Sequence, residues 1–598
     1  MRPTTYNLQP TTYFLLTTFL VTKRWVVAEP ITSETQNQFP ELSPVVLQLL
    51  WNRGIKTQEE IDVFLGPDWS RDTYGPELFL NMKEGVDRVF SALESGQVIT
   101  VHGDYDADGV CGSTVLLTTL RDISRELGFD EEKFNVYIPH REKEGYGMSV
   151  ATVEHLKIHE KTDLIVTVDC GISNKDAVDR AKELGIDTVI CDHHAIPKEL
   201  PDKAILIHPL VPGETFPNKH LCGTGVAYKF AAGLIHEAQR REAKFADGYE
   251  KWLLDLVAIA TVTDIVPLIG ENRVLEKYGL RVLNKTRRVG IKKLVEITGA
   301  KSGELDTISI GFQLGPRINA AGRMNHATEA LDLLIEEDEV KATELATKLN
   351  VTNIERQRAS LKMHTEAKKQ VGELDDRKMI FVVGEGWSPG LVGLVAGKLQ
   401  NEYHVPVFVV GKEGDTFIGS GRSVEGFDVT KALNAAADHL DKFGGHPQAC
   451  GFSTSGEDKL EKAKQAMMDY ADSQLSEEML MPRVNADARI TLEDINWDLH
   501  NDLETFRPFG CGNRQPVFVS EKLKIVSFSA VGKEGAHLKL RLQSSGGTII
   551  GAIAFRFGFW AEQLALGDLI DVAHEITLNE WNGNRELQLR IIDLKKSG

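Results

Sequence analysis

The chain contains 598 residues with a formal net charge of −19, and 42% of the residues are hydrophobic and 26% charged. This composition is typical of a globular protein with roughly three to five domains, and it excludes a low-complexity chain. Six scattered cysteines without a CxxC pair exclude a zinc ribbon and a disulfide framework, so we expect reduced thiols and a cytoplasmic protein.

Residues 1–40 are expected to form an N-terminal extension and lead-in. Their apolar run "YFLLTTFLV" at 13–21 is too short to span a bilayer, and no small-residue cleavage site of a signal peptide follows it. No other stretch approaches a transmembrane length, so we expect no association with a membrane.

Residues 41–325 are expected to form one domain that begins with helical segments such as "PVVLQLLWNRG". From residue 97, short apolar runs alternate with amphipathic helical patterns, and the runs read "QVITV", "FNVYI", "DLIVTV", "DTVIC" and "AILIH". This alternation predicts an α/β domain with a parallel sheet covered by helices.

The turn after the first run carries "GDYDADG" at 103–109, with aspartates at every second position. An EF-hand calcium loop opens in the same way, but it needs a bidentate glutamate at its twelfth position, where this chain has Val115. An EF-hand loop also lies between two helices, whereas the run before this turn is strand-like. The pattern therefore favours carboxylates gathered for another metal at a strand-to-helix turn.

Four apolar runs of this domain are followed by acidic or imidazole groups. The candidate ligands are Asp106, Asp108, Asp169, His193 and Asp264. Because the carboxyl ends of parallel strands meet at one crevice, we expect these side chains to come together despite their separation in sequence. Taken singly, an aspartate after a strand is more often a helix N-cap, and a histidine pair is more often part of a polar surface.

Carboxylates packed together repel one another unless cations neutralise them. Carboxylates combined with imidazoles suit Mn²⁺ or Mg²⁺ better than Zn²⁺ or Ca²⁺. Two such ions about 4 Å apart can clamp a phosphoryl group, and we expect Asp169 to bridge them.

The stretch "RVLEKYGLRVLNKTRRVGIKK" at 273–293 is strongly basic and has one acid. The net charge of the whole chain argues mildly against a nucleic-acid partner, but a local basic groove is sufficient for binding. A solvated helical surface explains the stretch equally well.

The remaining chain divides into three further parts. Residues 326–375 are expected to form a long helix between domains, since no Pro or Gly interrupts the pattern up to residue 371. Residues 376–480 have the pattern of a second α/β domain, and 485–598 contain short alternating strands that predict a separate small barrel or sandwich.

Several motifs now resemble those of a known family. "GDYDADG", "VDCGIS", "CDHHAIP" and "ATVTDIVPL" are similar to the four motifs of the DHH phosphoesterase superfamily. "GPRINAAGRM", "GSGRS", "GGHPQACGF" and "PFGCGN" narrow the resemblance to the RecJ-type single-stranded-DNA-specific 5′→3′ exonucleases of DNA repair and recombination. The resemblance runs from about Trp25 to the C-terminus, and it implies a DHH domain, an interdomain helix, a DHHA1 domain and an OB-fold.

The resemblance also implies roles for individual residues. Asp106, Asp108, Asp169, His193 and Asp264 would bind two Mn²⁺ or Mg²⁺ ions, with His102 a further candidate and Asp104 behind them. Asp169 and His194 would be catalytic, with His194 contacting the scissile phosphate. The residues implied to bind DNA are Arg141, Tyr146, Arg323, Ser420, Arg422 and His446. A guanidinium binds phosphate oxygens bidentately, although any one of these arginines alone is more often part of a surface ion pair.

Two positions depart from the pattern of the family. Ser388 stands where many relatives have His, and Arg514 stands where Pro is usual. In the tail, Lys539 and Arg541 would lie on one strand face, and Phe528 could either stack on a base or belong to the barrel core.

Two other functions are considered. A phosphoesterase of small substrates, such as oligoribonucleotides, cyclic dinucleotides or pyrophosphate, would not need the OB-like tail. A DNA-binding relative without activity would not need the complete carboxylate set. We therefore expect a monomeric exonuclease with single-stranded DNA as substrate, and a helicase and a single-strand-binding protein as partners.

Overall fold

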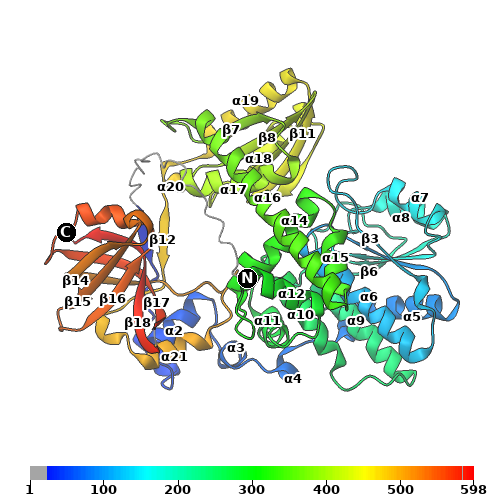
Figure 1. Cartoon of the computed structure of the whole chain (residues 1–598), viewed down its shortest axis with the longest axis horizontal. Helices are drawn as coiled ribbons and strands as arrows, with labels where there is room; N and C mark the ends of the chain where they lie inside the picture. Colours follow the sequence, from blue (N-terminus) through cyan, green and yellow to red (C-terminus); the bar gives the residue numbers. More distant parts are fainter. Residues whose placement is uncertain (1–22, 582, 598) are drawn as a thin grey trace, which may run out of the picture.

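The computed structural model describes residues 23–581 and 583–597. The apolar run at 13–21 and the rest of the first 22 residues lie outside this part of the chain. Among the helices of the described residues, none is both long enough and apolar enough to cross a membrane. Figure 1 shows three groups of elements: a barrel on the left, a mixed sheet at the top and a parallel sheet on the right.

The predicted parallel sheet is confirmed. Its strand order is β3-β2-β4-β5-β6, and every neighbouring pair is parallel. The strands are β2 (Ile99–Gly103), β3 (Phe134–Tyr137), β4 (Leu164–Val168), β5 (Asp187–Cys191) and β6 (Ile205–Ile207). Every residue of β2 and β4 is buried, which explains why these strands appear in the sequence as continuous apolar runs.

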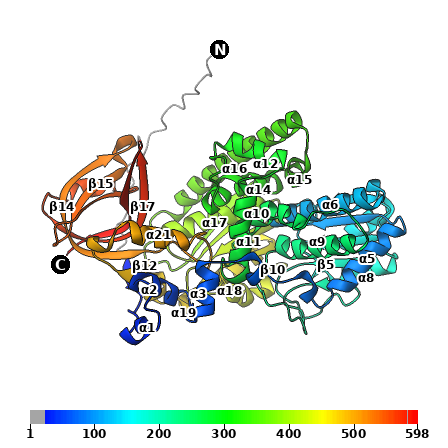
Figure 2. The same cartoon turned by 90° about the horizontal axis from the view of Figure 1, so that it is seen from below.

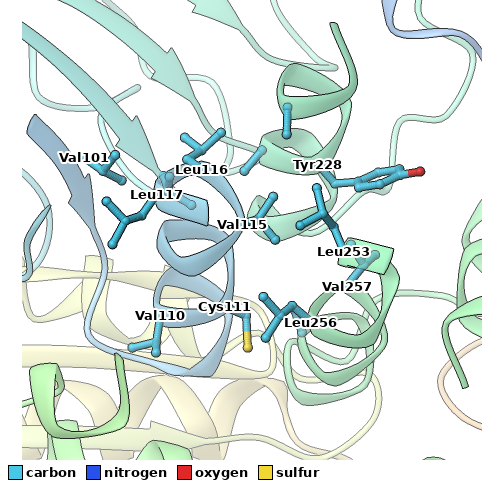
Figure 3. Close-up of a cluster of buried hydrophobic side chains, with 14 of the residues drawn as sticks. Val101, Val110, Cys111, Val115, Leu116, Leu117, Tyr228, Leu253, Leu256 and Val257 are labelled. Atoms are coloured by element: carbon cyan, nitrogen blue, oxygen red, sulfur yellow. The ribbon is translucent and has the colours of Figure 1, made fainter. Parts of the chain in front are cut away.

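Helices cover both faces of this sheet. They include α5 (Met82–Glu94), α6 (Ala107–Leu127), α7 (Val150–Ile158), α8 (Lys175–Glu183), α9 (Gly223–Arg240) and α10 (Leu254–Thr263). Figure 3 shows that side chains of α6, such as Cys111 and Val115, fill the space beside Tyr228 of α9 and Leu256 of α10. The helix α6 is therefore held from several sides, and its N-terminus has a fixed position at the end of β2.

The run "LLDLVAIATVT" was expected to precede Asp264 in the manner of a strand, and this interpretation is wrong. Residues 254–263 form the helix α10, which is buried all round among α6, α9 and α11 (Gly270–Leu283). A short helix without a polar face has no amphipathic period, so its sequence cannot be distinguished from that of a buried strand.

The segment expected as one interdomain helix consists of two helices. α15 (Thr328–Ile335) ends before a short acidic turn, and α16 (Glu339–Val371) begins after it. The side chain of Asp338 accepts hydrogen bonds from the backbone N–H groups of Val340 and Lys341, and this N-cap starts a new helix. α16 is 33 residues long and leads into the next sheet.

The second α/β unit has the strand order β10-β11-β9-β8-β7. Its strands are β7 (Ile380–Glu385), β8 (Val407–Glu413), β9 (Thr416–Arg422), β10 (Lys442–His446) and β11 (Ala449–Ser455). Only β7 and β8 are parallel, while β8, β9, β11 and β10 are antiparallel neighbours. Its helices are α17 (Pro389–Tyr403), α18 (Val429–Ala435) and α19 (Glu457–Gln474).

The C-terminal part forms a closed barrel, as expected for an OB-fold. The strands are β14 (Phe518–Val531), β15 (His537–Gln543), β16 (Ile549–Ala554), β17 (Leu569–Trp581) and β18 (Asn584–Lys596). The pairing of β14 with β17 closes the sheet, which leaves no open edge in this group of five strands. Phe528 packs against the barrel core, whereas Lys539 and Arg541 are exposed on β15.

The N-terminal helices pack on the barrel. We expected residues from 41 onward to belong to the domain of the parallel sheet, and for these helices that expectation is wrong. Leu47 and Leu50 of α2 (Pro44–Asn52) and Phe64 of α3 (Gln58–Leu65) share one buried cluster with residues of the barrel and of α21 (Trp497–Thr505). Figures 1 and 2 both show α2 beside α21. In addition, β1 (Arg24–Val27) pairs in parallel with β12 (Arg483–Ala486). The two ends of the chain therefore build one core.

A buried arginine is one of the links between this core and the helices around the parallel sheet. Arg273 of α11 is 1% exposed and donates hydrogen bonds to the carbonyl oxygens of Phe64, Thr505, Phe506 and Arg507. Burial lowers the pKa of its guanidinium to about 9. Because this first residue of the basic stretch 273–293 is enclosed by protein, it cannot contact DNA, and its role is to hold the two halves together.

Candidate active site

The five predicted ligands lie together at the carboxyl end of the parallel sheet. Asp106 is the N-cap residue of α6 and Asp108 lies in its first turn. Asp169 follows β4 and His193 follows β5, while Asp264 is the C-cap residue of α10. Three strand ends and one helix end therefore supply the side chains.

The distances place His193 at the centre of this cluster. Its Nε2 atom lies 3.1 Å from Oδ1 of Asp169, 3.7 Å from Oδ2 of Asp264 and 3.9 Å from Oδ2 of Asp108. The residues form three overlapping groups in which the candidate ligand atoms lie within 4.8 Å of one another. These groups are Asp169, His193 and His194; Asp108, His193 and Asp264; and Asp104, Asp106 and Asp169.

These groups can be compared with the roles that the sequence predicted for Asp169 and Asp104. Asp169 occurs in two of them, as does His193, and this is compatible with the expected bridging role of Asp169. Asp104, expected behind the ligands, instead belongs to a group with Asp106 and Asp169. His102 belongs to none of the three groups; it is buried, with Nδ1 3.6 Å from Sγ of Cys170.

Several buried side-chain atoms of this cluster have no hydrogen-bond partner, and they indicate whether metal ions fit there. Oδ1 of Asp104, Oδ1 of Asp169 and Nε2 of His193 are buried and have no hydrogen-bond partner. Buried polar atoms are nearly always satisfied, so three such atoms in one cluster require an explanation. Lone pairs of carboxylate and imidazole converging on one place suit divalent cations of the Mn²⁺ or Mg²⁺ type. The residues therefore fit the expected ions.

The electrostatics of the cluster support this fit. Burial, together with the negative charge of Asp108, raises the pKa of Asp169 and of Asp106, and it raises the pKa of Asp264 to about 9. Burial lowers the pKa of His193, which favours the neutral imidazole that a metal ligand must be. Protons or cations must therefore balance these carboxylates, and divalent ions would replace the protons.

The backbone around two of the ligands is unusual. Asp169 has φ of 60°, and so does Ile265, the residue after Asp264. Left-handed backbone costs roughly 1–3 kcal/mol for a residue with a side chain, and it persists only where surrounding structure enforces it. Such strain is typical of functional sites.

The motif "CGTG" at 222–225, which sequence reasoning missed, positions Asp108 and Asp169. The N–H groups of Gly223 and Thr224 donate to the two carboxylate oxygens of Asp108 over 2.6 and 2.7 Å. A Cβ atom on Gly223 would lie 2.5 Å from Cβ of Asp169, so only glycine allows α9 to come this close. In the sequence, the only sign of this close packing is the pair of glycines at the start of a helix.

His194 is held by Asp192 and Tyr146. Its Nδ1 lies 2.8 Å from Oδ1 of Asp192, and Oη of Tyr146 lies 3.1 Å from the same nitrogen. Burial opposes protonation, but the hydrogen bond and the charge of Asp192 outweigh it and raise the pKa of His194. Asp192 also accepts hydrogen bonds from the N–H groups of Ile172, His193 and His194, and Tyr146 donates to the carbonyl of Asp169.

The three arginines of the predicted DNA-binding set, Arg141, Arg323 and Arg422, lie close enough to one another for their charges to interact, and the charge of Asp106 acts on Arg323. Burial, followed by the charge of Arg141, lowers the pKa of Arg323 to about 10, and burial together with the charge of Arg141 also lowers the pKa of Arg422. Within the described residues, no carboxylate forms an ion pair with any of these three arginines. Arginines without acidic partners are suited to bind an anion such as a phosphate.

Ser420 orients one of these arginines. Its Oγ accepts a hydrogen bond from Nη1 of Arg422 over 3.0 Å and donates to the carbonyl of Cys450. A cavity of about 350 Å³ opens beside Arg422 between α16 and α17, and Arg356, Ser360, Gly393 and Lys398 contribute to its lining. His446 is exposed at the end of β10. It pairs with Ala449 of β11, and Ala449 in turn pairs with Arg422 of β9.

Ser388, which departs from the pattern of the family, caps α17 and contacts the loop that carries Arg141. Its Oγ accepts from the N–H of Gly390 and donates to Oε1 of Glu142, each over 3.2 Å. Arg323 donates to the carbonyl of Gly390 over 3.0 Å. Ser388 therefore helps to fix the second α/β unit against the arginine cluster.

Family models match three parts of the chain. They are the DHH family N-terminal domain over residues 98–261, the DHHA1 domain over 375–473 and the RecJ OB domain over 486–593. These ranges correspond to the parallel sheet with its helices, the mixed sheet and the barrel.

Relatives match over nearly the whole length. The single-stranded-DNA-specific exonuclease RecJ of Bacillus subtilis is 36% identical over 575 residues, which cover 95% of this chain and 70% of the relative. The enzyme of the same name from Haemophilus influenzae is 30% identical, with 92% and 95% covered. The crystal structure of RecJ in complex with Mn²⁺ from Thermus thermophilus has a TM-score of 0.80 at 28% identity, covering 96% of this chain and 80% of that chain. A structure of exonuclease RecJ bound to manganese has a TM-score of 0.56 at 32% identity and covers 66% of this chain and 95% of that chain.

Proposed function

Because the chain belongs to the RecJ family of single-stranded-DNA-specific exonucleases, we propose that the cluster around Asp169 and His193 is its catalytic metal centre. The protein is a metal-dependent exonuclease that hydrolyses phosphodiester bonds of single-stranded DNA, and Mn²⁺ and Mg²⁺ are the ions bound in the related structures. The observation that carries the proposal is the convergence of unpartnered carboxylate and imidazole atoms at one end of the sheet.

Asp106, Asp108, Asp169, His193 and Asp264 would hold two ions in this centre, with Asp169 between them. Bound divalent ions supply a water nucleophile at neutral pH and neutralise charge on the phosphate. The residues themselves fix the geometry: α6 and α9 hold Asp108 from two sides, and the left-handed turn after β4 presents Asp169. Asp104 offers a further oxygen to the same space.

His194 would act on the phosphate directly. Its raised pKa favours the protonated imidazolium, and Asp192 and Tyr146 set the orientation of the ring. A positioned imidazolium stabilises the negative charge that develops on the phosphoryl oxygens during hydrolysis. This role needs no movement of the histidine, because Asp192 already holds it.

The three arginines would bind the terminal 5′ phosphate of the strand. Arg141 lies in a turn after β3, Arg323 on α14 (Gly315–Met324) and Arg422 on β9. They lack acidic partners among the described residues, so an anion placed between them gains several charge-assisted hydrogen bonds. A terminal phosphate carries more charge than a phosphodiester, which would give the enzyme its 5′→3′ polarity.

We expect Arg422→Ala to lower kcat/KM on 5′-phosphorylated strands by roughly 10- to 100-fold, because hydrogen bonds to charged groups contribute about 1.5–3 kcal/mol. Activity on 5′-hydroxyl strands should fall much less. Arg422→Lys should restore only part of the preference, since lysine cannot bind bidentately. Arg180→Ala, which removes a surface arginine of α8 paired with Glu154 and Glu183, is the matched control. An unchanged ratio between the two substrates would show that Arg422 does not read the strand end.

One assay separates this function from that of a small-molecule phosphoesterase. The protein is incubated with Mn²⁺ and, in parallel, with end-labelled single strands, blunt duplexes, a dinucleotide and a cyclic dinucleotide. We expect stepwise shortening of the single strand from its 5′ end and little turnover of the duplex. Turnover of the small substrates alone would favour the second function, although the barrel and its RecJ OB match argue against it.

The further partners follow from the substrate. An exonuclease of single strands acts where duplex DNA has been opened, so we propose a helicase and a single-strand-binding protein as partners in DNA repair and recombination. We also propose a monomer, which light scattering of the purified protein tests.

A further inference from the structure

One phenylalanine beside the active site is far more exposed than its neighbours. Residues Ile310–Leu314 form a π-helical turn in which Ile310 and Leu314 are fully buried. Phe312, between them, is 76% exposed. A ring this exposed buries little apolar surface in the fold, and a group of exposed apolar side chains at a functional site often marks contact with a ligand.

The π-helical turn packs directly on the helix that carries Asp264. A Cβ atom on Gly311 would lie 3.8 Å from Cγ1 of Val262, and one on Gly315 would lie 2.4 Å from Cγ2 of Thr263. Gly315 is therefore needed for this close approach. The turn and the last turn of α10 form one unit, so the position of Phe312 is fixed relative to the metal centre.

Two further apolar side chains are exposed on the segments that flank this contact, one just after the end of α10 and one just before the π-helical turn. Ile265, which directly follows Asp264, is 70% exposed in left-handed backbone, and Ile308 is 54% exposed. The surface made by Phe312, Ile265 and Ile308 is called the apolar rim below. Because Ile265 directly follows Asp264 and the π-helical turn packs on the end of α10, a ligand on the apolar rim would lie beside the active site.

The charges beside the apolar rim indicate the nature of that ligand. Arg317 donates to the carbonyls of Phe312 and Gln313, and no carboxylate pairs with it among the described residues. Burial lowers the pKa of Arg356, and the charge of the nearby Arg317 lowers it further. The Nε atom of Arg356 is buried and has no hydrogen-bond partner. An aromatic ring next to unpaired arginines is the combination that binds single-stranded nucleic acid, with bases on the ring and phosphates on the arginines.

We propose that Phe312 is a stacking platform for a base of the DNA strand as it enters the metal centre. This inference rests on the proposed active site. It adds a contact with a base of the DNA, whereas the arginines described above contact only phosphates. A base inside a duplex has both faces covered by its neighbours, whereas a base of a single strand can offer one face to the ring. The platform therefore contributes to the selection of single strands.

Equilibrium binding without hydrolysis tests this proposal. Fluorescence anisotropy with a 5′-phosphorylated oligonucleotide in EDTA should show that Phe312→Ala weakens binding by roughly 5- to 150-fold, the range of one base stacked on an aromatic side chain. Phe312→Trp should bind as tightly as the wild type. Ile158→Ala, which removes a side chain 70% exposed at the end of α7, is the control and should have no effect.

A series of oligonucleotides with one abasic residue at successive positions identifies the contact. The wild type should lose affinity at one or two positions, and Phe312→Ala should show no additional loss at those positions, because the two changes remove the same interaction. Equal binding by Phe312→Ala and the wild type, or an unchanged abasic profile, would overturn the platform. Full hydrolysis by a folded Asp169→Asn variant would instead overturn the metal centre, so the two failures are distinguishable.

Discussion

Replacing Asp169 by asparagine should lower kcat on single-stranded DNA by on the order of 10³-fold or more, with the fold intact. Asp169 belongs to two of the three candidate ligand groups and is the proposed bridge between the two ions, so its loss should affect both ions at once. Groups that act as a unit lose most of their effect when one member is removed. Asparagine has nearly the same size, so the packing against Gly223 is kept.

Thermal unfolding gives a second measurement of the same variant that does not depend on activity. Ligands that bind only the folded state raise the melting temperature, so Mn²⁺ should stabilise the wild type. The variant should lose most of this metal-dependent shift. Without metal it should be no less stable than the wild type, because one of several mutually repelling buried carboxyl groups has been removed.

Asp202→Asn, a change of an exposed aspartate paired with Lys175, is the matched control and should alter neither turnover nor the response to Mn²⁺. Near-normal turnover by Asp169→Asn, together with an unchanged metal-dependent shift, would remove Asp169 from the metal centre.

The site was easier to predict from sequence than the arrangement of the domains. Asp106, Asp169 and His193 follow buried strands, and the rule that parallel strands end at one edge is sufficient to bring them together. Asp264 lies in the predicted cluster although the run before it was assigned to the wrong element. Buried helices and buried strands have the same apolar composition, and both can end at the same crevice.

Contacts between distant segments could not be predicted in the same way. Nothing in "PVVLQLLWNRG" indicates that its apolar face packs on a barrel more than 400 residues later in the chain. The burial of Arg273 is hidden for a related reason, because its partners are backbone carbonyls and carry no sequence signal. The glycine of "CGTG" at position 223 matters only because α9 approaches Asp169.

Removal of the C-terminal barrel alone, by deletion of 482–598, should leave a poorly folded protein. Leu47, Leu50 and Phe64 would lose the apolar surface that covers them, and β1 would lose its partner strand. The tail was expected to be a separate module, and this interpretation is wrong because the two ends of the chain share one core. A chain shortened at both ends to residues 67–481 removes both halves of that core together.

The doubly shortened chain should therefore fold and keep the chemistry, since every candidate ligand and the arginine cluster remain. It should cleave short oligonucleotides with a kcat close to that of the full chain. On long strands its affinity should fall, because the exposed Lys539 and Arg541 of the barrel no longer contact phosphates. The logarithm of affinity should also depend less steeply on salt, since each lost phosphate contact lowers the slope by about 0.7 for single strands.

Circular dichroism and thermal unfolding of both shortened chains, followed by binding across a salt series, test this expectation. A cooperative transition in the singly shortened chain, matching that of the doubly shortened one, would show that α2 and α3 do not need the barrel. An equal loss of activity on short and long strands would mean that the barrel supports the catalytic cleft. That support would act through the loop of residues 506–514, whose Cys511 carbonyl accepts a hydrogen bond from the N–H of Leu268, four residues after Asp264. The comparison thus separates binding by the barrel from bracing of the metal centre, because only bracing changes kcat on a short strand.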